Sequence, residues 1–180
     1  LARHLLAPNT KGRGEMADRI AAQAEGLPLL IRELALGVER GLADAADLSA
    51  LIRHRVDELP EQAQALLRVV ALIGRPVNAT IAAEVAGCEQ GELASRVLVA
   101  EDLVRSIEQD GGRHLECINS RVRSAVIEAP SAEEVEALHR AIAARTSPRE
   151  DPEGKGRHLL AAGLAEEAAP LLLTAAERAR

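Results

Sequence analysis

The chain contains no Phe, Tyr or Trp among its 180 residues. Its core must therefore be built from aliphatic side chains, and 35 Ala and 26 Leu residues supply most of them. Both residue types favour helices, and small side chains let helices pack closely. The composition therefore predicts a mainly α fold. The lack of aromatic rings also excludes the stacking platforms that hold single-stranded nucleic acid, and an aromatic cage for cations.

Charge and cysteine content narrow the function classes further. The chain has 22 basic and 28 acidic residues, and a net charge of -6 argues against a protein held on nucleic acid by phosphate contacts. Cys88 and Cys117 show no CxxC pairing, so we expect small core residues rather than a disulfide framework or a zinc site. We expect a cytoplasmic location and no membrane association. Because the chain starts at Leu1, we expect a piece of a longer protein.

Pro and Gly divide the first part of the chain into short helices. Gly26-Leu27-Pro28 forms a corner between two helices predicted within residues 15–40, and Pro28 suits the first turn of the second. A helix is predicted to begin at Asp47 or Ser49 and to end at Leu59. Another is predicted over Glu61–Ile73, with these residues buried: Leu66, Leu67, Val69, Val70 and Ile73.

The middle of the chain changes from helical to two-residue periodicity. A short helix is predicted to be capped by Asn78 or Thr80 and to end at Gly87. The next helix is predicted over Glu92–Asp102. Its predicted inward residues are Leu93, Ala94, Val97 and Leu98.

A β-hairpin is predicted after this helix. Apolar and polar residues alternate over 103–107 and 114–118, on either side of Gln109-Asp110-Gly111-Gly112, which favours a turn. Three helices followed by a hairpin is the order of a winged helix. Ser120 is predicted to cap the helix that follows, and Pro130 to close it.

The tail is predicted to be helical. Ser131 and Glu134 form a capping signal for its first helix, and a loop is predicted over 146–154. The segment after this loop has the sequence pattern of a tetratricopeptide-like helical hairpin, with small residues on facing sides and Gly163 at the bend. We expect further repeats in a longer parent protein.

The segment Glu25–Leu34, which contains Gly26-Leu27-Pro28, resembles the Gly-x-Pro motif of STAND-class signalling ATPases, a family that includes NB-ARC and bacterial transcription-activator ATPases. The resemblance implies that Gly26 and Pro28 bind the nucleotide, with Pro28 against adenine. The alternative is that Pro28 simply starts a helix. The resemblance also implies three parts: a helical lid (residues 1–48), a winged helix (49–130) and the start of a helical-repeat arm (131–180).

The catalytic half of such an ATPase is missing from the sequence. No Gly-x-x-x-x-Gly-Lys-Ser/Thr phosphate loop is present, so we expect no enzymatic activity and no catalytic residue in this chain. The resemblance implies that ATP or ADP with magnesium binds in the parent protein, on an upstream nucleotide-binding domain of the same chain. The implied output domain is a serine/threonine kinase or a transcription regulator.

The family's phosphate sensor is altered in this chain. In the family, a His-Asp pair at the end of the hairpin senses the nucleotide phosphate, and the matching positions here are Asn119 and Ser120. Asn119 can donate a hydrogen bond but cannot carry charge. The alternative is that these residues are the hairpin exit and a helix N-cap, a role that suits Ser120.

Three functions remain open. The first is a regulatory segment that clamps nucleotide and relays a signal between the ATPase and the repeat arm. The second is a stand-alone helical module that binds a protein through its tail. The third is a winged-helix DNA-binding domain, disfavoured because the predicted recognition helix is net acidic. Surface or half-buried roles are predicted for all five histidines, which lack metal-ligand spacing: His4, His54, His114, His139 and His158.

Overall fold

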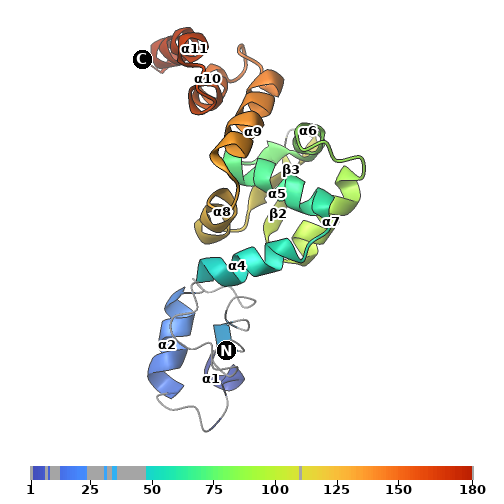
Figure 1. The fold of residues 1–180 in the computed structure, drawn as a ribbon, viewed down its shortest axis with the longest axis vertical. Helices are drawn as coiled ribbons and strands as arrows, with labels where there is room; N and C mark the ends of the chain where they lie inside the picture. Colours follow the sequence, from blue (N-terminus) through green and yellow to red (C-terminus); the bar gives the residue numbers. More distant parts are fainter. Residues whose placement is uncertain are drawn as a thin grey trace. The chain divides into compact units, whose positions relative to one another are not determined.

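The computed structural model describes residues 2–6, 8, 13–23, 31, 34–35, 48–109 and 111–179. The chain divides into two compact units, Leu1–Arg55 and Val56–Arg180. The described residues are mainly helical and include a three-stranded antiparallel sheet (Figure 1), which confirms the predicted mainly α fold. None of the described helices has the length and hydropathy that a membrane crossing requires.

The first unit contains two described helices, α1 (Ala2–Leu5) and α2 (Arg13–Gln23), which pack against each other. Leu6 and Ile20 are almost fully buried there. Helix α4 (Leu48–Asp57) follows and confirms the helix predicted from Asp47 or Ser49. The predicted corner at Gly26-Leu27-Pro28 lies outside the described residues.

Helix α5 (Glu61–Ile73) is the centre of the second unit and has the predicted bounds. Pro60 precedes it, and Gly74 ends it in the left-handed conformation with φ of 68°. Such a φ is costly for any residue with a side chain, so Gly suits this position. Its fully buried large residues are Leu66, Leu67, Val69 and Val70. Ile73 is only half-buried, contrary to prediction, because it lies at the helix end beside two cavities.

From α5 onward, the elements are arranged along the chain in the order of a winged helix. The elements are β1 (Val77–Asn78), α6 (Ala79–Val85), α7 (Gly91–Ala100), β2 (Val104–Gln109) and β3 (Gly112–Cys117). The strand order is β1-β3-β2, and the hairpin pairs Val104 with Cys117. The hairpin confirms the prediction, whereas the two-residue β1 was not predicted. Asn78 caps α6 by accepting from the Thr80 amide at 3.0 Å.

Helix α7 is rotated relative to the prediction. Ala94 and Leu98 are buried as predicted, but Leu93 is 57% exposed and Val97 is half-buried. The buried face instead includes Ser95, whose hydroxyl donates to the Gly91 carbonyl at 2.7 Å and thereby satisfies its hydrogen bonding. Small residues on this face let α7 pack closely against α5.

Four helices complete the second unit. They are α8 (Ser120–Ile127), α9 (Ala132–Arg145), α10 (Pro152–Ala161) and α11 (Ala165–Arg178). The capping box of Ser131 and Glu134 is confirmed. Helix α10 starts inside the predicted loop, because the Asp151 carboxylate caps it by accepting from the Gly154 amide at 2.8 Å and Pro suits its first turn.

The last two helices form the predicted hairpin. Helices α10 and α11 lie side by side (Figure 1), with Gly163 at the bend between them. Their contact with α9 is centred on Ala143, Leu159 and Ala168, and is extended by partly buried leucines such as Leu172. Aliphatic side chains therefore form the whole of this small core.

Candidate functional site

Two of the three residues that the resemblance assigns to the nucleotide, Gly26 and Pro28, lie outside the described residues. The third, Asn119, is described. It lies between the end of β3 and the start of α8, at the exit of the hairpin. The structure therefore gives the surroundings of the predicted sensor position, and not those of the predicted adenine contact.

Asn119 is the N-cap of α8. Its backbone is extended, with φ of -159° and ψ of 175°, and its Oδ1 accepts from the Val122 amide at 2.9 Å. Ser120 is the first residue of the helix and is exposed, so the prediction that Ser120 is the cap is wrong. The cap falls one residue earlier because Asn119 has an extended backbone and the helical conformation begins at Ser120, and Asn is as good a cap as Ser.

The side-chain nitrogen of Asn119, Nδ2, is buried and makes no hydrogen bond with any of the described residues. A buried amide donor without an acceptor costs on the order of 1–3 kcal/mol. Such groups are rare in folded proteins, so this donor needs a functional or structural explanation. Asn119 thus offers one occupied acceptor and one unsatisfied donor.

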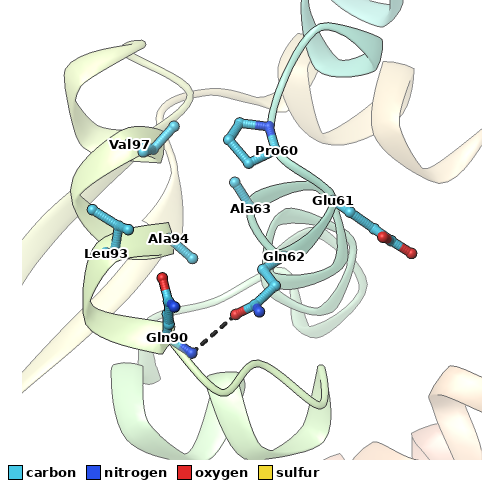
Figure 2. Close-up of a pocket in the computed structure, with 8 residues that line it drawn as sticks. All are labelled: Pro60, Glu61, Gln62, Ala63, Gln90, Leu93, Ala94 and Val97. Carbon is cyan, nitrogen blue, oxygen red and sulfur yellow. Dashed lines mark hydrogen bonds between the residues drawn. The ribbon is translucent and has the colours of Figure 1, made fainter.

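A shallow apolar groove lies between the start of α5 and α7 (Figure 2). Its volume is about 320 Å³, and its apolar walls include Pro60, Leu93 and Val97. At one end, the backbone amide of Gln90 donates to Oε1 of Gln62 at 2.9 Å, as the dashed line shows. This groove explains why Leu93 remains exposed, since its side chain forms part of the groove wall.

Glu92 on α7 forms ion pairs with two arginines of the same unit. Glu92 accepts from Arg113 at 2.9 Å and from Arg96 at 3.0 Å. Hydrogen bonds from Arg113 and then Arg96 hold the pKa of the Glu92 carboxyl below its usual value. Arg113 belongs to the hairpin, so the arginine that would contact a DNA phosphate is instead paired with a carboxylate on the predicted recognition helix.

Two histidines that the sequence leaves unconnected meet between α9 and α10. The Nδ1 atoms of His139 and His158 are 2.9 Å apart, and the ring centroids are 5.1 Å apart. His158 is 8% exposed, so it is more buried than predicted. Burial, followed by the neighbouring His139, lowers the pKa of His158 to about 4. Burial also lowers the pKa of His139.

The sequence carries no signal for this pair. The two histidines are 19 residues apart on separate helices, and only the packing of α9 against α10 brings them together. A metal-ligand search by spacing would not find them either, because neither belongs to an i, i+4 pair with another ligand.

The two cysteines are poor nucleophiles. Neither forms a disulfide, and both are half-buried rather than fully in the core. Burial raises the pKa of the Cys88 thiol, and it raises the pKa of Cys117 to about 12. Both therefore stay protonated near neutral pH, where a reactive cysteine would need to be a thiolate.

The structure thus offers three separate candidate features: Asn119, the groove along α7 and the buried histidine pair. Across residues 48–109 and 111–179, and in the described parts of the first unit, no three His, Cys, Asp or Glu side chains gather as metal ligands do. Comparison with known proteins found no matching family model, no similar curated protein and no similar solved structure.

Proposed function

We propose that this chain is a regulatory segment of a larger STAND-type ATPase. Its winged helix helps to clamp a nucleotide held by an upstream nucleotide-binding domain, and its helical tail relays a signal to that clamp. The proposal starts from the sequence resemblance around Gly26 and Pro28. The structural observation that supports it most is the position and the unsatisfied donor of Asn119.

Asn119 has the chemistry that a degenerate phosphate sensor requires. Its Oδ1 is committed to capping α8, so the side chain is held in place while Nδ2 keeps two N–H groups without a partner. Phosphate oxygens accept such hydrogen bonds. Because Nδ2 is buried, a movement at the hairpin exit must expose it, and an unsatisfied donor favours that movement by gaining an acceptor.

The surface of α7 supports a protein contact over a DNA contact. The predicted recognition helix presents Leu93 at 57% exposure, in the wall of an apolar groove, and Val99 at 39% exposure. Its carboxylate at Glu92 neutralises the nearest hairpin arginine. A DNA-reading helix needs surplus positive charge toward the phosphates.

Nucleotide binding by the protein that includes the upstream domain tests the proposal. Asn119→Asp keeps the capping oxygen but replaces the amide donor with a carboxylate that repels phosphate, so ADP should bind at least roughly tenfold more weakly by calorimetry. Pro28→Gly should also weaken ADP. Ser131→Ala removes the cap of α9 instead and serves as the matched control for lost helix stability. Equal ADP affinities for Asn119→Asp and Ser131→Ala would contradict the sensor role.

A second candidate is protein binding through the helical tail. Leu160 on α10 is 54% exposed and Leu173 on α11 is 67% exposed, so both leave apolar surface open to a contact. Further helical repeats packing on this hairpin would cover them in the parent protein. If the parent carries no phosphate loop upstream, this function replaces the first.

A further inference from the structure

A second cavity of about 340 Å³ lies where four elements of the second unit meet. We call it the basic pocket and define it by Arg75, which follows α5, Arg123 on α8, His139 on α9, and Arg157 and His158 on α10. Its size is at the lower end of small-molecule sites. None of these five residues belongs to the proposed nucleotide sensor, so the pocket needs an explanation of its own.

The arginines reach this pocket from three separate elements. Nε of Arg123 donates to the Ala71 carbonyl at 2.9 Å, which fixes the guanidinium and leaves its two terminal nitrogens as donors. Arg157 lies 3.7 Å from Glu153 in an exposed i, i+4 pair, a weak contact that a ligand can replace. Arg75 forms an ion pair with Asp151, and that carboxylate also caps α10.

Two glycines make room for these guanidinium groups. A Cβ on Gly74 would lie 2.7 Å from one terminal nitrogen of Arg123 and 2.8 Å from its central carbon. A Cβ on Gly154 would collide with Asp151 and lie 2.9 Å from a terminal nitrogen of Arg75. Any other residue at these positions would push the arginines away from their present positions.

The histidine pair adds donors whose number depends on protonation. With Nδ1 atoms 2.9 Å apart, one ring must donate its Nδ1 proton to the other, so the neutral pair has one Nε2 donor and one Nε2 acceptor. A further proton makes both Nε2 atoms donors. Burial is the main cause that keeps the pair neutral, and the nearby positive charges of Arg75 and Arg157 act in the same direction, against Asp151. Arg123 also lines the pocket. A bound anion would oppose the effect of these positive charges.

We propose that the basic pocket binds the phosphoryl group of a small molecule. Three guanidinium groups and two imidazoles approach from four elements, which suits a tetrahedral group with three outward oxygens better than a planar carboxylate with two. Inorganic phosphate and a small phosphate ester share this chemistry. The inference does not depend on the proposed nucleotide clamp.

Calorimetric titration of the 180-residue chain tests this proposal. The probes are inorganic phosphate, glycerol phosphate and acetate, at constant ionic strength in a buffer without other oxyanions. Phosphate should bind and acetate should not, and tighter binding of glycerol phosphate would identify an ester as the ligand. Binding of acetate as tight as that of phosphate, or no binding of either phosphate probe, would overturn the proposal.

A matched pair of variants separates the pocket from general charge. Arg157→Gln should weaken phosphate roughly tenfold, because it removes one charged hydrogen-bonding partner. Arg96→Gln removes the same charge from another exposed i, i+4 pair with a glutamate, at 74% against 73% side-chain exposure. It should leave the affinity unchanged. If the two variants bind phosphate equally well, the pocket is not the site.

Sulfate isolates the contribution of the histidines, since it remains a dianion across the accessible pH range. Its affinity should rise as the pH falls through the mildly acidic range, with uptake of a proton by the histidine pair. In His158→Gln this pH dependence should disappear while weak binding persists. A sulfate affinity that is independent of pH in the wild-type chain would exclude the histidines from the site.

Discussion

The cap of α8 is assigned to Asn119 and not to the neighbouring serine, and single substitutions distinguish the two. Asn119→Ala and Asn119→Ser both remove the unsatisfied Nδ2, but only serine keeps an oxygen that can accept from the Val122 amide, so the alanine variant should have the lower free energy of unfolding, by about 1 kcal/mol. Ser120→Ala changes an exposed residue inside the helix and should alter the free energy of unfolding by less than about 0.5 kcal/mol. Urea denaturation followed by circular dichroism measures these effects. A loss from Ser120→Ala larger than the difference between the two Asn119 variants would restore Ser120 as the cap.

His158 makes stability depend on pH. The ordinary pKa of a histidine is 6.5, and in the folded chain that of His158 falls to about 4. Between these pH values the unfolded chain binds a proton at His158 that the folded chain does not bind. The contribution of neutral His158 to the free energy of unfolding is therefore fully present above pH 6.5 and is lost as the pH falls toward 4. The loss should reach about 3 kcal/mol at most.

Denaturation of the wild-type chain and of His158→Gln across that pH range measures this loss. The buffer must contain no phosphate or sulfate, because an anion in the basic pocket would stabilise the protonated pair. The difference in unfolding free energy between the two proteins should change with pH in the stated direction. A constant difference would show that His158 is accessible to protons in the folded state.

The elements that the sequence predicted well are those bracketed by local signals. Pro60 and Gly74 bound α5, and Ser131 with Glu134 marks the start of α9. The two-residue strand β1 has no such signal, since it exists only because β3 lies beside it. The sequence also has no local signal for the rotation of α7, because tertiary packing decides which of its faces is buried. A groove beside α5 leaves Leu93 uncovered.

The candidate site shows the same division. The position of Asn119 at the hairpin exit follows from the order of residues along the chain. The basic pocket does not, because its arginines and histidines come from elements far apart in sequence, and only tertiary packing joins them. The sequence gives no signal that Gly74 and Gly154 lie so close to the guanidinium groups.

Close packing between α10 and α11 depends on Gly156. A Cβ there would lie 2.9 Å from the side chain of Leu172, so Gly156→Leu should overpack the contact and cost about 1–3 kcal/mol in unfolding free energy. Leu172→Ala in the same chain should recover part of that loss. Glu153→Leu adds the same side chain at an exposed position of α10 and serves as control. A double variant no more stable than Gly156→Leu alone would contradict this packing.

The aliphatic composition of the molecule and its net charge limit two different kinds of binding. The second unit buries its central leucines and valines without any aromatic ring, so the missing aromatics do not prevent a core. Because the chain has no aromatic residues, its surface has no aromatic rings on which bases could stack. The net charge of -6 then decides how the molecule meets a polyanion, because a protein of that sign is repelled by a phosphate backbone at long range.

The chain should therefore fail to bind random-sequence DNA even at low salt, where electrostatic attraction is strongest. Electrophoretic shift of a short duplex measures this directly. Glu92→Lys removes the carboxylate that pairs with Arg96 and Arg113 and adds a positive charge to α7, so it is the variant most able to create weak, salt-sensitive binding. A wild-type shift that weakens steeply as salt rises would overturn this prediction, and it would make α7 a recognition helix after all.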